Sequence, residues 1–183
     1  MAFISYADYG PNNPNLAMQS EQAQGARPGV LPNILRIHAH RPDAVSGHSR
    51  LQDIVLRGPS ELSGRQREMI GIVVSQINDC LYWLQHLGDS FREQVTDEGF
   101  VARLQSDYRG ADIRPADRAM LEYCAKLTRA PRTVTQADVD ALHAAGFSDA
   151  AIHDMCLVAA YFAFANRIVQ GLGIELESPL RGK

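Results

Sequence analysis

The sequence predicts an all-α protein, on three observations. Helix start signals and stop signals alternate along the chain from Pro32 onward, and no convincing alternating strand pattern appears. The 183 residues are 45% hydrophobic and 21% charged, which is close to the globular average and excludes a disordered or fibrous chain. We therefore expect a helical bundle of about six to eight helices in a single domain.

The first 28 residues differ in composition from the remainder. They carry several glycines and prolines and three asparagines between Asn12 and Asn15, which interrupt regular structure. We predict an irregular arm over residues 1–28, which a partner subunit could order, and a helical domain over residues 29–183.

The clearest helix start lies at Ser63. Ser63 and Gln66 have the spacing of a capping box, and the helix continues through apolar residues at helical spacing, Ile70, Val73, Val74 and Ile77. Asn78 and Asp79 then favour a stop, and a new helix can begin at Cys80.

Further helix boundaries follow along the chain. Starts are predicted at Pro115, at Thr135 with Asp138, and at Ser148 with Asp149, and glycine caps at Gly58, Gly146 and Gly171. The apolar run from Cys156 to Ala165 is shorter than the roughly 20 residues that span a bilayer. We interpret it as a buried core helix.

Charge and cysteine content exclude several function classes. Lys plus Arg is 18 and Asp plus Glu is 21, for a net charge of −3, so the chain lacks the electrostatic footprint of a nucleic-acid or anionic-membrane binder. No Lys or Arg precedes Arg27, which argues against a secretory signal. Three cysteines do not indicate a secreted disulfide framework. We predict a cytoplasmic protein.

Cys80 is the residue most suggestive of chemistry by position alone. A thiol in the first turn of a helix faces the positive end of the helix dipole, which favours the thiolate. A buried structural cysteine is the alternative, because free cysteines are usually found in cores. His38, His40 and His48 are close in sequence, but His38 and His40 point roughly 200° apart on a helix, so no metal site is predicted.

The stretch from Glu61 to Gly88, ELSGRQREMIGIVVSQINDCLYWLQHLG, resembles the core motif of the carboxymuconolactone decarboxylase superfamily, in its alkylhydroperoxidase D-like branch. The stretch from Arg118 to Glu177 resembles the carboxy-terminal half of its peroxidase-related subfamily. With LPNILRIHAHRPDA before the motif, the similarity covers most of the chain beyond Val30. The resemblance implies an oligomeric all-α bundle, a trimer or a hexamer.

The resemblance also implies a thiol-redox site made of a glutamate, a CxxC motif at the start of the next helix, and a histidine further along. Glu68 and Cys80 occupy the positions of the glutamate and the first cysteine. Trp83 stands where the family has its second cysteine, so an internal CxxC disulfide is impossible. The commonest histidine position is Leu87, and His86 lies one residue earlier, where the peroxidase-related subfamily often has a histidine.

These correspondences give the predicted site residues their roles. Cys80, Glu68 and His86 are the catalytic candidates, with Glu68 as the proton acceptor for the thiol. His86 is expected to stack on Tyr82 and Trp83, which lie four and three residues before it.

The remaining cysteines and the stretch after the apolar run receive structural interpretations. Cys124 and Cys156 are predicted to be buried packing residues and not resolving thiols, which leaves another subunit or an external thiol to resolve an oxidised Cys80. Asn166 and Arg167 are expected to form a satisfied polar cluster.

Three functions remain open at this point. The first is a peroxidase-like thiol oxidoreductase that uses Cys80 and an external reductant. The second is a decarboxylase, isomerase or hydrolase for a small organic molecule, with Tyr82 and Trp83 as pocket walls. The third is a redox-silent oligomer that binds a ligand or partner. Phosphate-binding glycine motifs are absent, and no cofactor is predicted.

Overall fold

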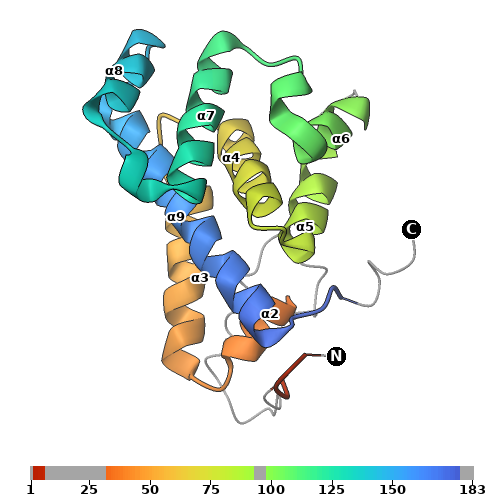
Figure 1. Cartoon of the computed structure of the whole chain (residues 1–183). Coiled ribbons are helices and arrows are strands. Elements are labelled where there is room, and N and C mark those ends of the chain that lie inside the picture. The colour runs from red at the N-terminus through yellow and green to blue at the C-terminus, as the bar shows by residue number, and fades with distance from the viewer. Residues whose placement is uncertain (1, 7–31, 93–97, 178–183) are drawn as a thin grey trace. The chain divides into compact units, whose positions relative to one another are not determined.

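The protein is described by a computed structural model that covers residues 2–6, 32–92 and 98–177. Within these residues the chain is helical and contains no strand, which confirms the all-α prediction (Figure 1). The helices are α2 (Asn33–His38), α3 (Pro42–Leu56), α4 (Gly64–Ile77), α5 (Leu81–Arg92), α6 (Glu98–Asp107), α7 (Pro115–Arg129), α8 (Gln136–Ala144) and α9 (Asp149–Leu172), with short 3-10 segments η1 (Tyr108–Gly110) and η2 (Pro131–Thr133).

The chain divides into two compact units, one from Val55–Asn166 and one from Met1–Ile54 together with Arg167–Lys183. All five predicted site residues lie in the first of these. Residues 7–31 are outside the described part of the chain, and most of the predicted arm falls there. The prediction of one domain over residues 29–183 stays a prediction.

Helix α4 is the central element of the Val55–Asn166 unit, where it contacts α5, α6 and α7 (Figure 1). Ile70, Ile72 and Val73 are inaccessible to solvent. Because the side chains at these neighbouring positions point in different directions around a helix, α4 is enclosed on several sides. Gly71 permits this enclosure, since a Cβ there would collide with the ring of Phe162 and lie 2.9 Å from Leu87 Cδ1.

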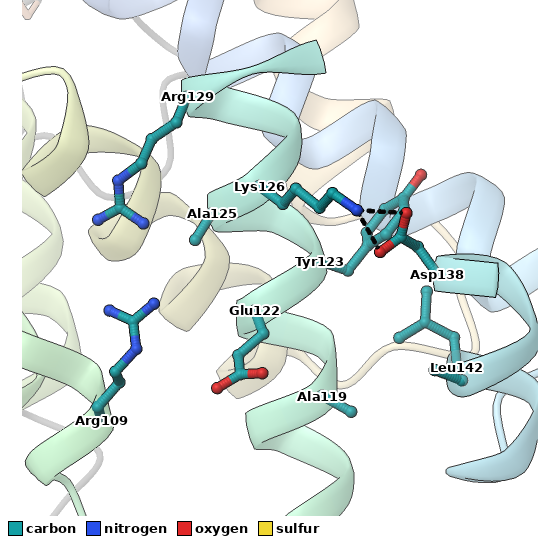
Figure 2. A pocket seen from close by; sticks show the side chains of 10 residues that line it. Arg109, Ala119, Glu122, Tyr123, Ala125, Lys126, Arg129, Asp138 and Leu142 are labelled. Atoms are coloured by element: carbon teal, nitrogen blue, oxygen red, sulfur yellow. Dashed lines mark hydrogen bonds and ion pairs between the residues drawn. The ribbon is translucent and has the colours of Figure 1, made fainter. Parts of the chain in front are cut away.

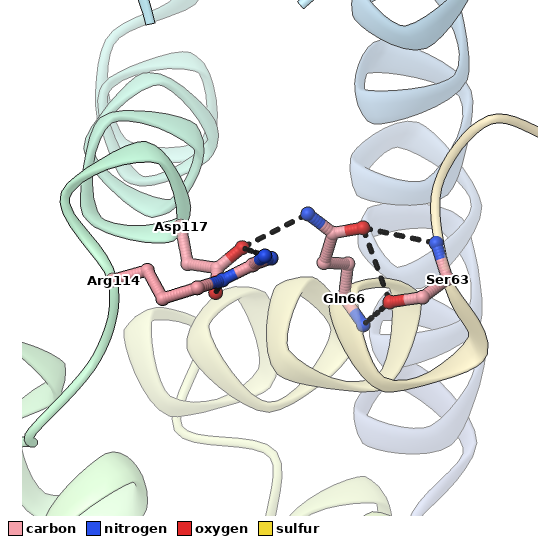
Figure 3. A network of polar contacts seen from close by, with 4 residues as sticks. All are labelled: Ser63, Gln66, Arg114 and Asp117. Carbon is pink, nitrogen blue, oxygen red and sulfur yellow. Dashed lines mark hydrogen bonds and ion pairs between the residues drawn. The ribbon is translucent and has the colours of Figure 1, made fainter. Parts of the chain in front are cut away.

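A polar network fixes the start of α4 against the start of α7 (Figure 3). Ser63 and Gln66 form the predicted capping box. The Gln66 Nε2 group also donates to Asp117 Oδ1 at 2.9 Å, and Arg114 Nε donates to Asp117 Oδ2 at 2.8 Å. Burial pushes the pKa of Asp117 upward, but the hydrogen bonds from Arg114 and Gln66 prevail and hold it below its ordinary value. Asp117 is therefore a buried carboxylate that is fully partnered.

Most of the predicted helix boundaries agree with the structure, but the glycine cap expected at Gly171 does not. Helix α8 begins at the predicted Thr135–Asp138 capping box and ends before Gly146, which has a positive φ of 94°. Gly171 does not end α9, because the helix continues to Leu172 and Gly173 takes the positive φ of 62°. The predicted cap of α9 lies two residues before the observed one, because Gly171 and Gly173 are both candidates for it.

Helix α9 contains the predicted apolar core segment. Val158, Ala159, Tyr161, Phe162 and Ala165 are buried, as expected for a core helix. By length and composition α9 is also the one helix in the described residues that could cross a membrane. Core helices of globular proteins meet the same criteria, and the buried face of α9 identifies it as such a helix.

The unit that holds both chain ends is closed by hydrogen bonds between them. The amide of Phe3 donates to the carbonyl of Leu172 at 2.9 Å. The side chain of Asn33 donates to the carbonyl of Glu175 at 2.9 Å, and its amide donates to Glu177 Oε1 at 2.7 Å. The start of α2 is thus tied to the segment that follows α9.

A histidine pair lies in the same unit. His48 Nδ1 and His38 Nε2 are 3.1 Å apart, and the ring centroids are separated by 4.9 Å. His48 is only 4% exposed, and burial together with the neighbouring His38 lowers its pKa to about 4. His48 is therefore neutral at pH 7, and this pairing was not foreseen from the sequence.

The close contact at Gly71 predicts a destabilising substitution. We expect Gly71→Ala to lower the free energy of unfolding by about 1–3 kcal/mol, because the added methyl overpacks the contact with Phe162 and Leu87. Urea unfolding at pH 7 measures this effect. The matched control is Gly47→Ala on α3, where a Cβ meets open space, and it should be neutral or stabilising. Equal effects of the two substitutions would contradict the packing argument.

The buried histidine predicts acid destabilisation. The folded pKa of His48 is about 4 against an unfolded value of 6.5, so the unfolded chain binds more protons below pH 6.5 and stability falls as the pH drops. Between pH 7 and pH 5 this loss is about 2 kcal/mol. His48→Gln should remove most of it in urea unfolding, whereas His153→Gln, at a side chain 74% exposed, should not. An unchanged pH slope in His48→Gln would show that other groups cause it.

Candidate active site

Cys80 lies at the junction between α4 and α5, where one short backbone motif ends the first helix and starts the second. The amide of Asp79 donates to the Gln76 carbonyl at 3.1 Å, and the amide of Cys80 donates to the Ser75 carbonyl at 2.9 Å. Asp79 has a φ of 53° and is the only non-glycine residue with a positive φ in the described chain. These features define a Schellman motif at the end of α4.

The carbonyl of Cys80 begins the next helix, because it accepts a hydrogen bond from the Leu84 amide at 3.0 Å. Cys80 is therefore the N-cap residue of α5, and the helix itself begins at Leu81. The expected start at Cys80 was one residue early.

The sulfur of Cys80 receives the hydrogen bonds that a helix N-terminus offers, but it is not activated. The backbone N–H groups of Tyr82 and Trp83 donate to it, which lowers its pKa. However, Cys80 is only 1% exposed, and burial, aided by the charge of Asp79, raises the pKa above its ordinary value. The predicted preference for the thiolate is wrong for this structure.

Glu68 lies on α4 and is held against the later part of α5. Ser90 Oγ donates to Glu68 Oε1 at 2.9 Å. The helical face of Glu68 continues through Gly71, Ile72 and Ser75, all of which are buried, so this face is turned inward. Ser90 follows Cys80 by ten residues, which is about 15 Å along the helix axis. The structure thus places the Glu68 carboxylate beside Ser90 and not at the N-cap of α5.

An aromatic cluster fills the first two turns of α5. The centroids of Tyr82 and His86 are 4.4 Å apart, and those of Trp83 and His86 are 6.1 Å apart, which confirms the predicted stacking of His86. Trp83 also meets Phe162 of α9 edge to face at 5.4 Å. Trp83 is 6% exposed, so the indole that replaces the second cysteine is a packed side chain.

Hydrogen bonds link Cys80 to two polar residues that the sequence did not assign to the site. Ser75, whose carbonyl accepts from the Cys80 amide, donates its hydroxyl to Asn166 Oδ1 at 3.2 Å. Asn166 is 0% exposed. Among the described residues, its Nδ2 group has no hydrogen-bond partner, and neither does Trp83 Nε1. The predicted satisfied cluster at Asn166 is therefore only half satisfied.

The other two cysteines differ in exposure. Cys124 is buried as predicted, with its Sγ 4.0 Å from the Met155 carbonyl oxygen, and burial raises its pKa. Cys156 is exposed, contrary to the prediction. The apolar run that suggested burial forms part of helix α9, which has a buried side and an exposed side. Cys156 lies on the exposed side, as does the partly exposed Phe164.

A cavity with charged lining residues lies on α7 and does not include Cys80. It has a volume of about 330 Å³ and is lined by α7, α8 and Arg109 of η1. Figure 2 shows the guanidinium groups of Arg109 and Arg129 pointing toward each other, while Lys126 bonds to Asp138 at 2.7 Å. The cavity includes none of the predicted site residues. Within the described ranges no three His, Cys, Asp or Glu side chains are grouped so as to hold a metal ion.

Comparison with known proteins places these features in a family. Residues 42–114 match the model of the carboxymuconolactone decarboxylase family, a range that contains Glu68, Cys80 and His86. No match was found among curated protein sequences.

Solved structures give the same result over the full length. A peroxidase-related protein from Silicibacter sp. TM1040 has 28% identity and a TM-score of 0.90, with 100% of this chain and 95% of that chain covered. An alkylhydroperoxidase AhpD core protein from Ralstonia eutropha JMP134, described as peroxidase-related, has 26% identity and a TM-score of 0.84, with 98% and 94% covered. The debrominase Bmp8 shares the fold at 18% identity and a TM-score of 0.76, with 98% and 93% covered.

The family model covers the helices that carry the site, and the two peroxidase-related structures cover nearly the whole chain. Residues 42–114 thus match the carboxymuconolactone decarboxylase family, and the chain has the fold of the AhpD-like, peroxidase-related proteins.

Proposed function

We propose that the protein is a peroxidase-like thiol oxidoreductase in which Cys80 is the only site thiol and an external thiol is the reductant. The observation that carries this proposal is the position of Cys80 as the N-cap of α5, with the Tyr82 and Trp83 amides donating to its sulfur. A thiol held in this way can stabilise negative charge as it reacts. The likeness to two peroxidase-related proteins supports the same assignment.

The proposed reaction has two stages. The Cys80 sulfur attacks the terminal, hydrogen-bearing oxygen of a hydroperoxide. An S–O bond forms, the O–O bond breaks, and an alcohol leaves with the thiol proton. The resulting sulfenic acid condenses with an external thiol to a mixed disulfide and water, and a second external thiol regenerates Cys80. Trp83 at the position of a second thiol makes the external partner necessary.

The raised pKa of Cys80 requires a group that accepts its proton during attack. His86 lies on α5 between Cys80 and Ser90, the residue that holds the Glu68 carboxylate. We assign His86 as the group that passes the proton between Cys80 and Glu68. Glu68 then holds the proton only until it passes to the leaving oxygen, and it does not contact the sulfur.

A second candidate function is an enzyme of non-redox type, such as a decarboxylase, isomerase or hydrolase, that acts on a small organic molecule. The aromatic cluster of Tyr82, Trp83 and His86 favours it, because aromatic side chains line many small-molecule sites. Activity that survives Cys80→Ala and fails in Glu68→Gln would support this candidate against the first.

The proposal extends to assembly and location. The superfamily implies a homo-oligomer, a trimer or a hexamer, in which residues 1–28 could contact a neighbouring subunit. The net charge of −3 favours neither nucleic acid nor an anionic membrane as a partner, and three cysteines without a disulfide framework are typical of a cytoplasmic protein.

The first test of this function follows the oxidation state of Cys80. Brief treatment with tert-butyl hydroperoxide should add one oxygen atom to Cys80, and added glutathione should convert it to a mixed disulfide, both read by peptide mass. Cys80→Ser should abolish consumption of the hydroperoxide. Cys156→Ser, which removes an exposed thiol, should retain it. Hydroperoxide consumption that persists in Cys80→Ser would exclude the proposed mechanism.

The second test measures the pKa of Cys80. We expect the iodoacetamide alkylation rate of Cys80 to rise with an inflection above pH 9.0, because burial disfavours the thiolate. The same cysteine in urea-unfolded protein should titrate at its ordinary pKa and serves as the control. An inflection below pH 8 in the folded protein would show that the helix N-terminus outweighs burial.

A further inference from the structure

Two residues that hydrogen bonds link to Cys80 carry buried N–H donors that the described residues do not use. Trp83 Nε1 and Asn166 Nδ2 lack hydrogen-bond partners among the described residues, although Trp83 is 94% buried and Asn166 fully so. An unpartnered donor in a core is costly, and most buried polar groups are paired. Two such donors on residues linked to one thiol therefore call for a functional explanation.

Hydrogen bonds connect both residues to Cys80 from different elements. Trp83 follows Cys80 by three residues, and its backbone N–H donates to the Cys80 sulfur. Asn166 accepts from Ser75 Oγ, and the carbonyl of Ser75 holds the Cys80 amide. Phe162 contacts the Trp83 ring and lies one helical turn before Asn166 on the same side of α9. The two donors thus belong to one shell of residues around the thiol.

We propose that the Trp83 indole N–H and the Asn166 carboxamide bind the departing oxygen of the hydroperoxide at Cys80. This inference rests on the proposed function and names the groups that serve its first chemical step. As the O–O bond breaks, negative charge develops on the leaving oxygen, and preorganised donors in a water-excluded site stabilise it. The proton released from Cys80 then reaches that oxygen, and the products are a sulfenic acid and an alcohol.

The same assignment explains how a chain with Trp83 in place of a second cysteine can still carry out the first step, the oxidation of Cys80 to a sulfenic acid. A second thiol resolves the sulfenic acid, and an indole cannot do so. The indole instead contributes a directed donor that is held rigidly by Phe162 and His86. Asn166 is the second donor in this proposal. Ser75 donates to its Oδ1 oxygen, so its Nδ2 group remains to bind the substrate oxygen.

The test compares two reactions of the same sulfur. Trp83→Phe keeps a ring and removes the donor, so we expect oxidation of Cys80 by tert-butyl hydroperoxide to slow by about tenfold or more. Alkylation of Cys80 by iodoacetamide should change by less than about twofold, because its leaving iodide needs no oxygen-directed donor. Asn166→Leu should have the same selective effect, with thermal unfolding measured to confirm that the variants are folded.

The control is Tyr108→Phe, which removes a buried hydroxyl on η1 that takes no part in the hydrogen bonds around Cys80. It should leave both rates unchanged. Equal oxidation rates in wild type and Trp83→Phe, or a parallel fall in oxidation and alkylation, would overturn the donor role while the proposed function stands. Wild-type Cys80 that resists the hydroperoxide altogether would overturn the proposed function itself.

Discussion

The hydrogen bond from the Cys80 amide to the Ser75 carbonyl is the interaction on which the candidate site depends. It closes the end of α4 only because Asp79 adopts a left-handed conformation, which aspartate tolerates better than most side chains. The carbonyl of the same Cys80 then starts α5. Because its amide bonds to one helix and its carbonyl to the next, the Cys80 backbone cannot move without unwinding a helix end. The Tyr82 and Trp83 amides hold the sulfur itself.

Two physical effects on the pKa compete at this sulfur, and the larger of them decides its protonation state. The Tyr82 and Trp83 amides favour the thiolate, as helix N-termini do. Burial disfavours it more strongly. A thiol that is protonated at neutral pH resists unspecific alkylation and oxidation, since only the thiolate is a strong nucleophile. In the proposed mechanism, oxidation of Cys80 then needs two kinds of group during attack, a proton acceptor and hydrogen-bond donors for the leaving oxygen. Only a substrate that engages both kinds of group should react.

Much of this arrangement could be predicted from the sequence, because helix boundaries depend on local chemistry. The capping boxes at Ser63 and Thr135 and the stacking of His86 on Tyr82 follow from spacing alone. Burial depends on the folded partner surfaces, so the sequence could not foresee the raised pKa of Cys80 or the exposure of Cys156. The roles of Ser75 and Asn166 were also hidden, since they are 91 residues apart in sequence.

The replacement of a cysteine by Trp83 changes more than the number of thiols. The larger side chain packs edge to face against Phe162 at 5.4 Å and is only 6% exposed, so the position of a second thiol is taken by a core aromatic residue. In the proposed mechanism the indole N–H stabilises the charge that attack creates. An indole cannot resolve a sulfenic acid, and for this reason the proposed reductant is an external thiol.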